Sequence, residues 1–381
     1  MSTQAVNRPL HLAIVLGTRP EAVKMAPLVL AAAAQPDRFK VDVVSTGQHK
    51  EMLASMLDWF GLKPSVSLDI MRANQDLAHI TMSSLSGIND WLKTAQPDWV
   101  LVQGDTTTTF AGALAAFYNR IPVAHVEAGL RTHDKYSPYP EEANRVMTAH
   151  LAHLHFPPTE GARQNLLREG IDDSVVTVTG NTGIDALLWT RNKLQAQGSR
   201  AVQTGREMLV TAHRRENHGD PMRGLCHAVL ALLDKYPDLR VHFPVHMSPK
   251  VREVVMPALQ GHPRIRLTEP LDYAAFVGAM MDASFILTDS GGVQEEAPSL
   301  GKPVLVLRES TERPEAMAAG AARLVGMNPD RIQQEVCRLM DDADAYAAMS
   351  QAMNPYGDGL AAGRILDVLA RTPVRLQSAD V

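Results

Sequence analysis

Residues 10–24 read LHLAIVLGTRPEAVK and contain the pattern that decides the fold. The mostly apolar run at 10–16 predicts a buried strand. Gly17 then permits a tight turn, and Pro20 favours the first turn of a helix because proline lacks the amide hydrogen that this turn leaves unpaired. A strand that passes through a short turn into a helix is the first half of a βαβ unit, and such units build parallel sheets.

The same alternation of strand and helix recurs along the chain and restarts once. Helical patterns separate the predicted strands, and the two series are joined near 175–205. Further apolar, β-branched runs lie at 40–46, 98–105 and 121–127 in the first series and at 207–213, 239–244, 264–268, 284–289 and 303–308 in the second. We therefore predict an α/β protein with two doubly wound, Rossmann-like domains facing a central cleft.

Composition argues against several classes of function. The chain has 381 residues, which suggests two domains, and its 42 acidic and 37 basic side chains leave a formal charge of −5. No Lys/Arg-rich block marks a surface for nucleic acid or anionic lipid. Cys226 and Cys337 supply neither a disulfide framework nor a cysteine metal site, so a reducing cytoplasm is the expected setting. Neither a signal peptide nor a membrane-spanning run is predicted.

Polar side chains follow the predicted strands, at the edge where open parallel sheets bind ligands. After the first strand, Arg19 and Lys24 stand near a helix N-terminus, where free N–H groups favour an anion. The phosphate-loop pattern GxxxxGK[ST] and the dinucleotide pattern GxGxxG are both absent, and no cofactor is predicted. The alternative interpretation is a solvated helix start with a salt bridge to Glu21.

A second candidate anion site is the DSGG motif that ends the run at 284–289 and opens a helix. Ser290 is placed to cap that helix, and the two glycines after it let a phosphate approach the backbone amides. Glu296 is a candidate for holding ribose hydroxyls, and Arg313 is a further candidate phosphate partner. Ordinary helix capping explains the serine and the glycines equally well.

Four groups suited to proton transfer lie at or just beyond strand ends. Asp105, Glu127 and Glu141 belong to the first half, and His213 ends a strand of the second. Each alone is also explained as a helix cap or an ion pair, and Asp105 in particular precedes four threonines whose helix it is placed to cap. Their shared position at strand ends favours a catalytic role.

Three histidines in the sequence HLAHLH invite comparison with a metal site. His150, His153 and His155 have no acidic or cysteine partner spaced to complete one. We interpret them as interface or core histidines near the end of a helix, and no metal site is predicted.

Eight motifs, spread in order over about residues 10–370, together resemble one enzyme family. They are GTRPEAVKMAP, QGDTTTT, HVEAGLRT, YPEEANR, TAHRREN, PVH, DSGGVQEEAPSLGKPVLVLRESTERPEA and NPYGDG. The resemblance is to the non-hydrolysing UDP-N-acetylglucosamine 2-epimerases. It implies a glycosyltransferase-B-like architecture, a homodimer, and a C-terminal helix that returns to the first domain, giving domains of 1–180 plus 360–381 and of 181–359.

The reaction implied by the resemblance is reversible C2 epimerisation of UDP-N-acetylglucosamine (UDP-GlcNAc) to UDP-N-acetylmannosamine (UDP-ManNAc), without nicotinamide or metal. Loss of the C2 proton and of UDP from C1 gives an enzyme-bound 2-acetamidoglucal, and UDP then adds back. A sugar C2–H is a very weak acid, so a carboxylate removes this proton only when departure of UDP is well advanced. Cations must therefore hold the diphosphate.

The resemblance also implies a role for each matching residue. The acid/base carboxylates are Asp105, Glu127 and Glu141, with His213 beside the leaving phosphate. The residues that bind diphosphate, uridine or ribose are Arg19, Lys24, Phe276, Ser290, Gly291, Gly292, Glu296 and Arg313. In bacterial relatives a second UDP-GlcNAc molecule activates the enzyme through a region that matches Gln48, His49, Gln75, Glu142, Arg215 and His246.

Other functions fit parts of the pattern. A retaining glycosyltransferase of the same architecture also binds a UDP-sugar through the DSGG motif and Glu296, but it does not need several carboxylates from the first domain. A hydrolysing epimerase differs only in that water intercepts the glycal and releases free ManNAc and UDP. The retained carboxylates count against a catalytically silent UDP-sugar sensor. Epimerases of diacetamido uronic acid nucleotides share many of the motifs, which leaves the C3 and C6 substituents open.

Overall fold

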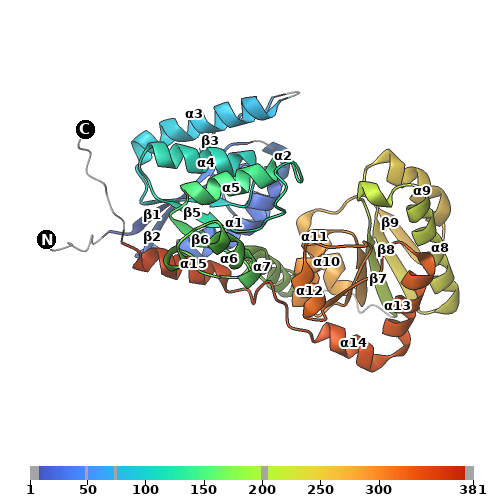
Figure 1. Ribbon diagram of the computed structural model, residues 1–381. Coiled ribbons are helices and arrows are strands. Elements are labelled where there is room, and N and C mark those ends of the chain that lie inside the picture. The colour runs from blue at the N-terminus through green and yellow to red at the C-terminus, as the bar shows by residue number, and fades with distance from the viewer. Residues whose placement is uncertain (1–7, 48–49, 73–74, 199–204, 374–381) are drawn as a thin grey trace. The chain divides into compact units, whose positions relative to one another are not determined.

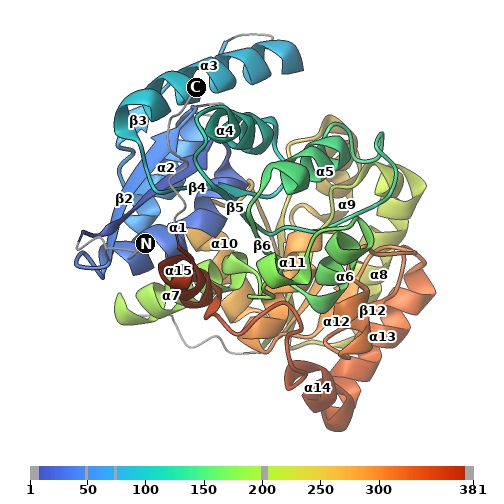
Figure 2. The same ribbon diagram turned by 60° about the vertical axis from the view of Figure 1, so that its left-hand side comes forward.

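Two six-stranded parallel sheets, one in each of two structural units, organise the chain (Figures 1 and 2). This computed structural model describes residues 8–47, 50–72, 75–198 and 205–373. Unit 1 consists of Met1–Ala186 and Gly357–Val381, and unit 2 of Leu187–Tyr356. The chain thus leaves unit 1, passes through all of unit 2 and then comes back.

The strand order is the same in both sheets and matches that of dinucleotide-binding folds. In unit 1 the order is β3-β2-β1-β4-β5-β6, and in unit 2 it is β12-β11-β10-β7-β8-β9. The strands of unit 1 are β1 (Leu10–Leu16), β2 (Phe39–Ser45), β3 (Val66–Ser67), β4 (Trp99–Gln103), β5 (Val123–Val126) and β6 (Leu154–Phe156). Those of unit 2 are β7 (Arg206–Thr211), β8 (Leu239–Pro244), β9 (Ile265–Thr268), β10 (Phe285–Thr288), β11 (Val304–Val306) and β12 (Ala322–Leu324). The predicted doubly wound α/β class is confirmed.

Helices cover both faces of each sheet. Those of unit 1 are α1 (Arg19–Ala33), α2 (Lys50–Phe60), α3 (Leu77–Ala95), α4 (Thr107–Tyr118), α5 (Glu141–Leu151), α6 (Glu160–Arg168), α15 (Ala361–Arg371) and the start of α7 (Thr182–Ala196), which continues into unit 2. Those of unit 2 are α8 (Asp220–Lys235), α9 (Pro249–Leu259), α10 (Tyr273–Asp282), α11 (Gly291–Glu296), α12 (Pro314–Ala318), α13 (Pro329–Asp341) and α14 (Ala343–Ser350). Short 3₁₀ turns lie at Asp173–Val175, Arg215–Asn217 and Ala297–Leu300.

Packing of the helices explains the alternating apolar runs. In unit 1, α3 packs on α4 and α4 on α5, while α1 packs on α2 and α15. In unit 2, α8, α9 and α13 lie together on one side of the sheet and α10, α11 and α12 on the other (Figure 1). A strand covered by helices on both faces is buried along its length, as β1 is from residue 12 to residue 16. This burial explains why the sequence of the strand is continuously apolar.

Three short edge strands, β3, β6 and β12, were not among the predicted runs. Two or three residues are too few to show a periodic pattern. The histidine tract illustrates the consequence: α5 ends at Leu151, so His150 is helical as predicted, whereas His155 lies in β6 beside His125 of β5 and is buried.

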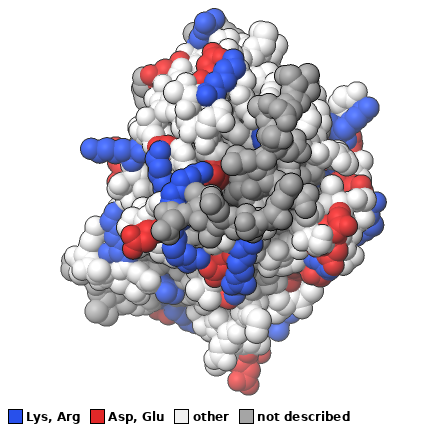
Figure 3. All heavy atoms as spheres, turned by 90° about the vertical axis from the view of Figure 1, so that its left-hand side faces the viewer, with Lys and Arg blue, Asp and Glu red and all other residues white. Residues whose placement is uncertain are grey.

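The distribution of surface charge and the character of the helices agree with what the composition indicates. Figure 3 shows Lys/Arg and Asp/Glu side chains interspersed on the face in view. Within the described ranges, no helix combines the length and apolar character that a membrane span requires.

The returning helix α15 is fastened to unit 1 by a buried carboxylate. The Asp185 side chain accepts hydrogen bonds from the backbone N–H groups of Ala361 (3.3 Å) and Ala362 (2.9 Å), at the start of α15. Ile365 and Leu369 are fully buried on the inner face of the helix. Burial raises the pKa of Asp185 to about 6, although the two backbone hydrogen bonds oppose this shift.

This raised pKa predicts a pH-dependent stability. A carboxyl group with a higher pKa in the folded chain stabilises the fold when protonated, so its contribution is present below about pH 4 and is lost as the pH rises through 6. Asp185→Asn stays neutral throughout. We expect the free energy of unfolding of the wild type, relative to this variant, to fall by about 3 kcal/mol between pH 4 and pH 7. Urea unfolding of both chains across this range measures the difference, and a constant difference would contradict the prediction.

Candidate active site

A pocket at the carboxyl ends of β1, β4 and β5 in unit 1 gathers four of the predicted site residues. Its volume is about 390 Å³, and Lys24, Asp105, Glu127 and Glu141 all line it. The pocket lies where the strand order reverses between β1 and β4, which is the usual ligand position in such sheets. The three predicted acid/base carboxylates and the Lys24 ammonium therefore share one pocket, which Glu21 also lines.

Glu127 is held by side chains from two neighbouring strand exits. Its carboxylate accepts hydrogen bonds from Lys24 Nζ (2.7 Å) and Gln103 Nε2 (2.6 Å), and its side chain is 9% exposed. The backbone of Glu127 has a φ of +60°, and its N–H donates to the carbonyl of Phe156 (3.0 Å). Non-glycine residues rarely adopt this conformation, and it is found most often at functional sites. A sharp backbone turn thus directs a carboxylate into the pocket.

Glu21, which the sequence did not single out as a site residue, joins the exits of β1 and β4. It is 1% exposed and accepts hydrogen bonds from the N–H groups of Gly17 (3.0 Å) and Thr18 (2.7 Å). It also accepts from the hydroxyls of Thr106 (2.7 Å) and Thr109 (3.1 Å). Burial raises the pKa of Glu21, and these hydrogen bonds partly counter the shift.

The sequence does contain a signal for the contact between Glu21 and the backbone before α1. Thr-x-x-Glu at residues 18–21 is the spacing of a capping box at a helix start. The alternative interpretation, an exposed salt bridge to Glu21, is wrong: Glu21 is buried and Lys24 pairs with Glu127. Gly17 is required beside it, since a Cβ there would lie 2.3 Å from Thr46 Oγ1.

Asp105 is paired with Arg145, another residue that the sequence did not single out. Arg145 in turn lies 3.2 Å from Glu142, whose carboxylate also accepts the N–H groups of Thr132 (3.1 Å) and His133 (2.9 Å). A residue predicted to bind an activator is therefore connected through one guanidinium to a residue predicted to transfer protons.

The helix after Asp105 is capped by its neighbour instead. Thr106 is the N-cap of α4, and its hydroxyl accepts the N–H of Thr109 (3.0 Å), so the capping interpretation of Asp105 is wrong. His125, fully buried in β5, contacts the Gly104 carbonyl with Nε2 at 2.8 Å. Burial lowers the pKa of His125 to about 4, so the ring is neutral and Nε2 donates. The hydrogen bond from His125 to Gly104 thus fixes the turn that carries Asp105.

In unit 2, Asp289 ties together the exits of β7 and β10. Its buried carboxylate accepts the N–H groups of His213 (2.8 Å) and Arg214 (2.8 Å) and Nδ2 of Asn217 (2.9 Å). Burial acts to raise the pKa of Asp289, but the hydrogen bonds from His213 and Arg214 outweigh it and the pKa is lowered. His213 Nδ1 lies 2.9 Å from Asp289 Oδ1, and the His213 ring stacks on His246 with centroids 5.5 Å apart.

The DSGG motif opens α11 as predicted. Ser290 occupies the N-cap position, but its hydroxyl makes no capping hydrogen bond, so ordinary capping does not account for this side chain. Arg313 donates from Nε to Glu295 (2.8 Å), and a Cβ on Gly291 would lie 2.9 Å from the guanidinium carbon. Arg313, Ser290 and the first glycine are therefore grouped at the carboxyl end of β10.

The remaining predicted residues are placed individually. Arg19 begins α1 and Glu296 ends α11, while Phe276 lies half-buried in α10. Gly292 follows Gly291 at the start of α11. Of the residues predicted to bind an activator, Gln75 accepts a hydrogen bond from the N–H of Arg72, and Arg215 is exposed. Gln48 and His49 lie outside the described residues. Among the described residues, no three His, Cys, Asp or Glu side chains are grouped to hold a metal ion.

Comparison with known proteins gives one consistent result. The family model described as UDP-N-acetylglucosamine 2-epimerase matches residues 13–370. The UDP-N-acetylglucosamine 2-epimerase of Escherichia coli (strain K12) is 51% identical over 372 residues, 95% of this chain and 99% of the relative. The crystal structure of the UDP-GlcNAc 2-epimerase of Neisseria meningitidis bound to UDP-GlcNAc is 45% identical, with a TM-score of 0.85 over 95% of this chain and 100% of the other. The structure of a Listeria monocytogenes protein of the same description is 47% identical, with a TM-score of 0.88 over 95% and 96%.

Proposed function

Because this chain belongs to the UDP-N-acetylglucosamine 2-epimerase family, we propose that it interconverts UDP-GlcNAc and UDP-ManNAc without hydrolysing them. The observation that carries the proposal is the pocket in which Lys24, Asp105, Glu127 and Glu141 meet. An epimerisation at carbon needs one group to remove a proton and another to return it, and a retaining glycosyltransferase transfers no proton at the sugar carbon.

The proposed mechanism is elimination followed by re-addition. UDP leaves C1 as a carboxylate of the pocket takes the C2 proton, which gives an enzyme-bound 2-acetamidoglucal. A second group then delivers a proton to the opposite face of C2 while UDP adds back to C1. Of the three proposed acid/base carboxylates, Glu127 is oriented by Lys24 and Gln103, and Asp105 is oriented by Arg145.

Binding of UDP is assigned to cations and strand-exit groups. Arg19 and Lys24 in unit 1, with Arg313 and the Ser290 to Gly292 segment in unit 2, are proposed to neutralise the diphosphate. Glu296 is proposed to hold the ribose and Phe276 to contact the uracil. His213, oriented by Asp289, is proposed to stand beside the leaving phosphate.

Activation by a second substrate molecule is also proposed, through Gln75, Glu142, Arg215, His246 and the two residues outside the described ranges. Two contacts support a coupling: Arg145 joins Glu142 to Asp105, and His246 stacks on His213. An anion that rearranges Glu142 or His246 would therefore change the surroundings of a proposed catalytic group. The homodimer and the cytoplasmic location stay predictions.

Incorporation of solvent deuterium at C2 tests the proposed mechanism. The chain is incubated with UDP-GlcNAc in heavy water containing EDTA and no added NAD, and products are followed by proton NMR. We expect UDP-ManNAc to form with deuterium at C2, because the carbon loses its proton in every turnover.

Two outcomes would contradict the proposal. Product that keeps its original proton at C2 would indicate an oxidation and reduction route, and free ManNAc with stoichiometric UDP would indicate a hydrolysing epimerase. Asp105→Asn serves as the control, since it should slow deuterium incorporation and product formation together.

A further inference from the structure

One ion pair in the active-site pocket joins two residues that have different tasks in the proposed reaction. Lys24 is proposed to neutralise the diphosphate, and Glu127 is proposed to exchange a proton with C2. In the structure the Lys24 ammonium donates to both oxygens of the Glu127 carboxylate, at 2.7 and 2.5 Å. Contacts between two charged groups are among the stronger hydrogen bonds in proteins. The diphosphate and Glu127 therefore compete for one ammonium.

Glu127 is the fixed member of this pair. Its backbone turns at a φ of +60°, and its side chain is 9% exposed. Gln103 Nε2 donates to Oε2 of the carboxylate at 2.6 Å. Because this contact does not depend on Lys24, the carboxylate stays oriented when the ammonium moves.

Lys24 is the movable member. Its neighbours Val23 and Met25 in α1 are buried, which fixes the backbone, but the Lys24 side chain is 23% exposed. A lysine ammonium is carried on a flexible four-carbon stem. Rotation within this stem moves the charge by a few ångströms and leaves the helix in place.

The stereochemistry of the substrate brings the diphosphate near this ammonium. The proton that Glu127 is proposed to exchange is on C2, and the diphosphate is attached to the neighbouring carbon, C1. A base in contact with this proton is therefore only a few bond lengths from the first phosphate group. An ammonium in contact with the base, as Lys24 is, lies within reach of the phosphate oxygens after a side-chain rotation.

From these contacts we propose that the diphosphate of the substrate draws Lys24 away from Glu127 and thereby frees this carboxylate for proton transfer at C2. The inference rests on the function proposed above. The C2 proton then moves to a Glu127 oxygen, and the electron pair of the C2–H bond forms the C1=C2 double bond. The electron pair of the C1–O bond leaves with UDP. In the opposite direction of the reaction the same carboxyl group returns the proton.

This exchange of partners makes the base available only together with the leaving group. A carboxylate removes a proton from C2 only when departure of UDP is well advanced, and that departure needs a neutralised diphosphate. One ammonium that changes partner meets both needs, because it reaches the phosphate as it releases the carboxylate. Proton removal is thus confined to a sugar that carries the diphosphate.

Calorimetry with UDP tests the exchange without relying on turnover. In the wild type UDP must displace Glu127 from Lys24, whereas Glu127→Gln offers the ammonium only a neutral amide oxygen. We expect UDP to bind this variant about tenfold more tightly, which is the difference between a hydrogen bond that joins two charges and one that does not. Uridine, which has no phosphate, should bind both chains equally.

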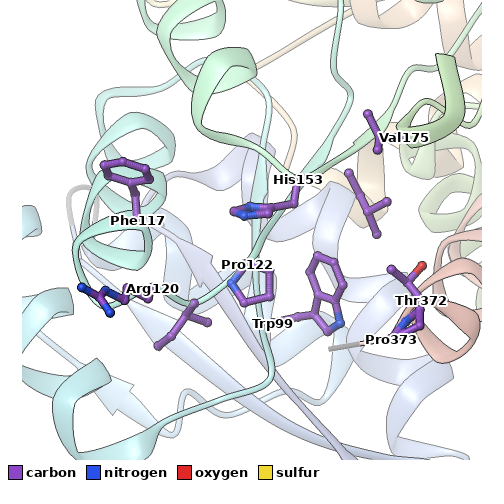
Figure 4. A pocket seen from close by; sticks show the side chains of 10 residues that line it. Trp99, Phe117, Arg120, Pro122, His153, Val175, Thr372 and Pro373 are labelled. Atoms are coloured by element: carbon purple, nitrogen blue, oxygen red, sulfur yellow. The ribbon is translucent and has the colours of Figure 1, made fainter. Parts of the chain in front are cut away.

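Glu141→Gln is the matched control, since it removes the same charge from another residue that lines the pocket. The general effect of this charge on an anion should raise UDP affinity by no more than about threefold. Arg120→Gln is the control for a distant charge. Arg120 lines a separate pocket at the amino ends of β4, β5 and β6, the opposite edge of the sheet (Figure 4). Neither UDP affinity nor turnover should change in that variant.

A double-mutant cycle isolates the part that depends on Lys24. In a Lys24→Met chain, whose folding is checked by circular dichroism, Glu127→Gln should alter UDP affinity by less than about threefold, because the competition no longer exists. The proposal would be overturned by a tenfold gain that persists in this background. Unchanged UDP affinity in Glu127→Gln, or an equal gain in Glu141→Gln, would overturn it as well.

These results are separate from the deuterium test of the proposed function. Deuterium incorporation without a gain in UDP affinity would retain the epimerase and reject the exchange of partners. A gain in a chain that incorporates no deuterium would retain the release of Lys24 by the diphosphate and reject the epimerase. Failure of millimolar UDP to bind either the wild type or Glu127→Gln would contradict both.

Discussion

Replacing Glu127 with Gln is expected to lower the turnover of UDP-GlcNAc epimerisation by about 10²- to 10⁴-fold. The amide keeps the size of the side chain but cannot take a proton from carbon, and it presents an N–H₂ group to Lys24 and Gln103, which now donate to the carboxylate. Turnover at saturating substrate, followed by proton NMR, measures the loss. Calorimetry with UDP should show no loss of affinity, because Glu127 is not proposed to bind the nucleotide and its partner Lys24, which is proposed to bind the diphosphate, keeps its charge.

Glu169→Gln is the matched control. Glu169 is also a partly buried carboxylate of unit 1 in an ion pair, with Arg131 at 2.7 Å, but it does not line the active-site pocket. We expect nearly normal turnover in this variant. A Glu127→Gln enzyme that keeps more than a tenth of wild-type turnover would assign Glu127 to a structural role and leave Asp105 and Glu141 as the acid/base pair.

Replacing Glu21 with Ala is expected to destabilise the fold by about 3 kcal/mol, because it leaves two buried backbone N–H groups and the Thr106 hydroxyl without the acceptor that Glu21 provides. For a unit of this size the loss corresponds to a melting temperature about 6–12 °C lower. Thermal unfolding followed by circular dichroism measures it.

Glu160→Ala gives the comparison. Glu160 also lies in the first turn of a helix, but it is exposed and its partners, Arg163 and Gln164, belong to the same helix, so its removal tests a first-turn carboxylate that joins no other element. We expect only a small change in melting temperature. Equal changes in the two variants would show that Glu21 acts through the helix terminus and not by joining the exits of β1 and β4.

The sequence predicted the long central strands well because each is a continuous apolar run between turn residues. The runs at 10–16 and 239–244 coincide with β1 and β8. It did not predict β6 or β12, since a three-residue edge strand is defined by its hydrogen-bonded neighbour and not by a pattern of its own.

For the candidate site, strand ends indicated which carboxylates share a pocket, because parallel strands bring their carboxyl ends to one edge. The residues that orient these carboxylates were less visible. Arg145 lies 40 positions from Asp105, and Asp289 lies 76 from His213, so only the folded chain shows these pairs. The capping box predicts that Glu21 bonds to the backbone at the start of α1. Its hydrogen bonds to Thr106 and Thr109 join segments more than 80 positions apart, so the sequence does not reveal them.

The return of the chain to unit 1 also affects how the protein is made. A ribosome delivers residues in order, so the segment Leu187–Tyr356 emerges before α15 exists to cover α1. Unit 2 is continuous and has all its residues available while unit 1 still lacks its last helix. Domains generally fold as units during synthesis. Unit 1 therefore completes its core last, and until then the apolar surface that Ile365 and Leu369 bury stays open to chaperones and proteases.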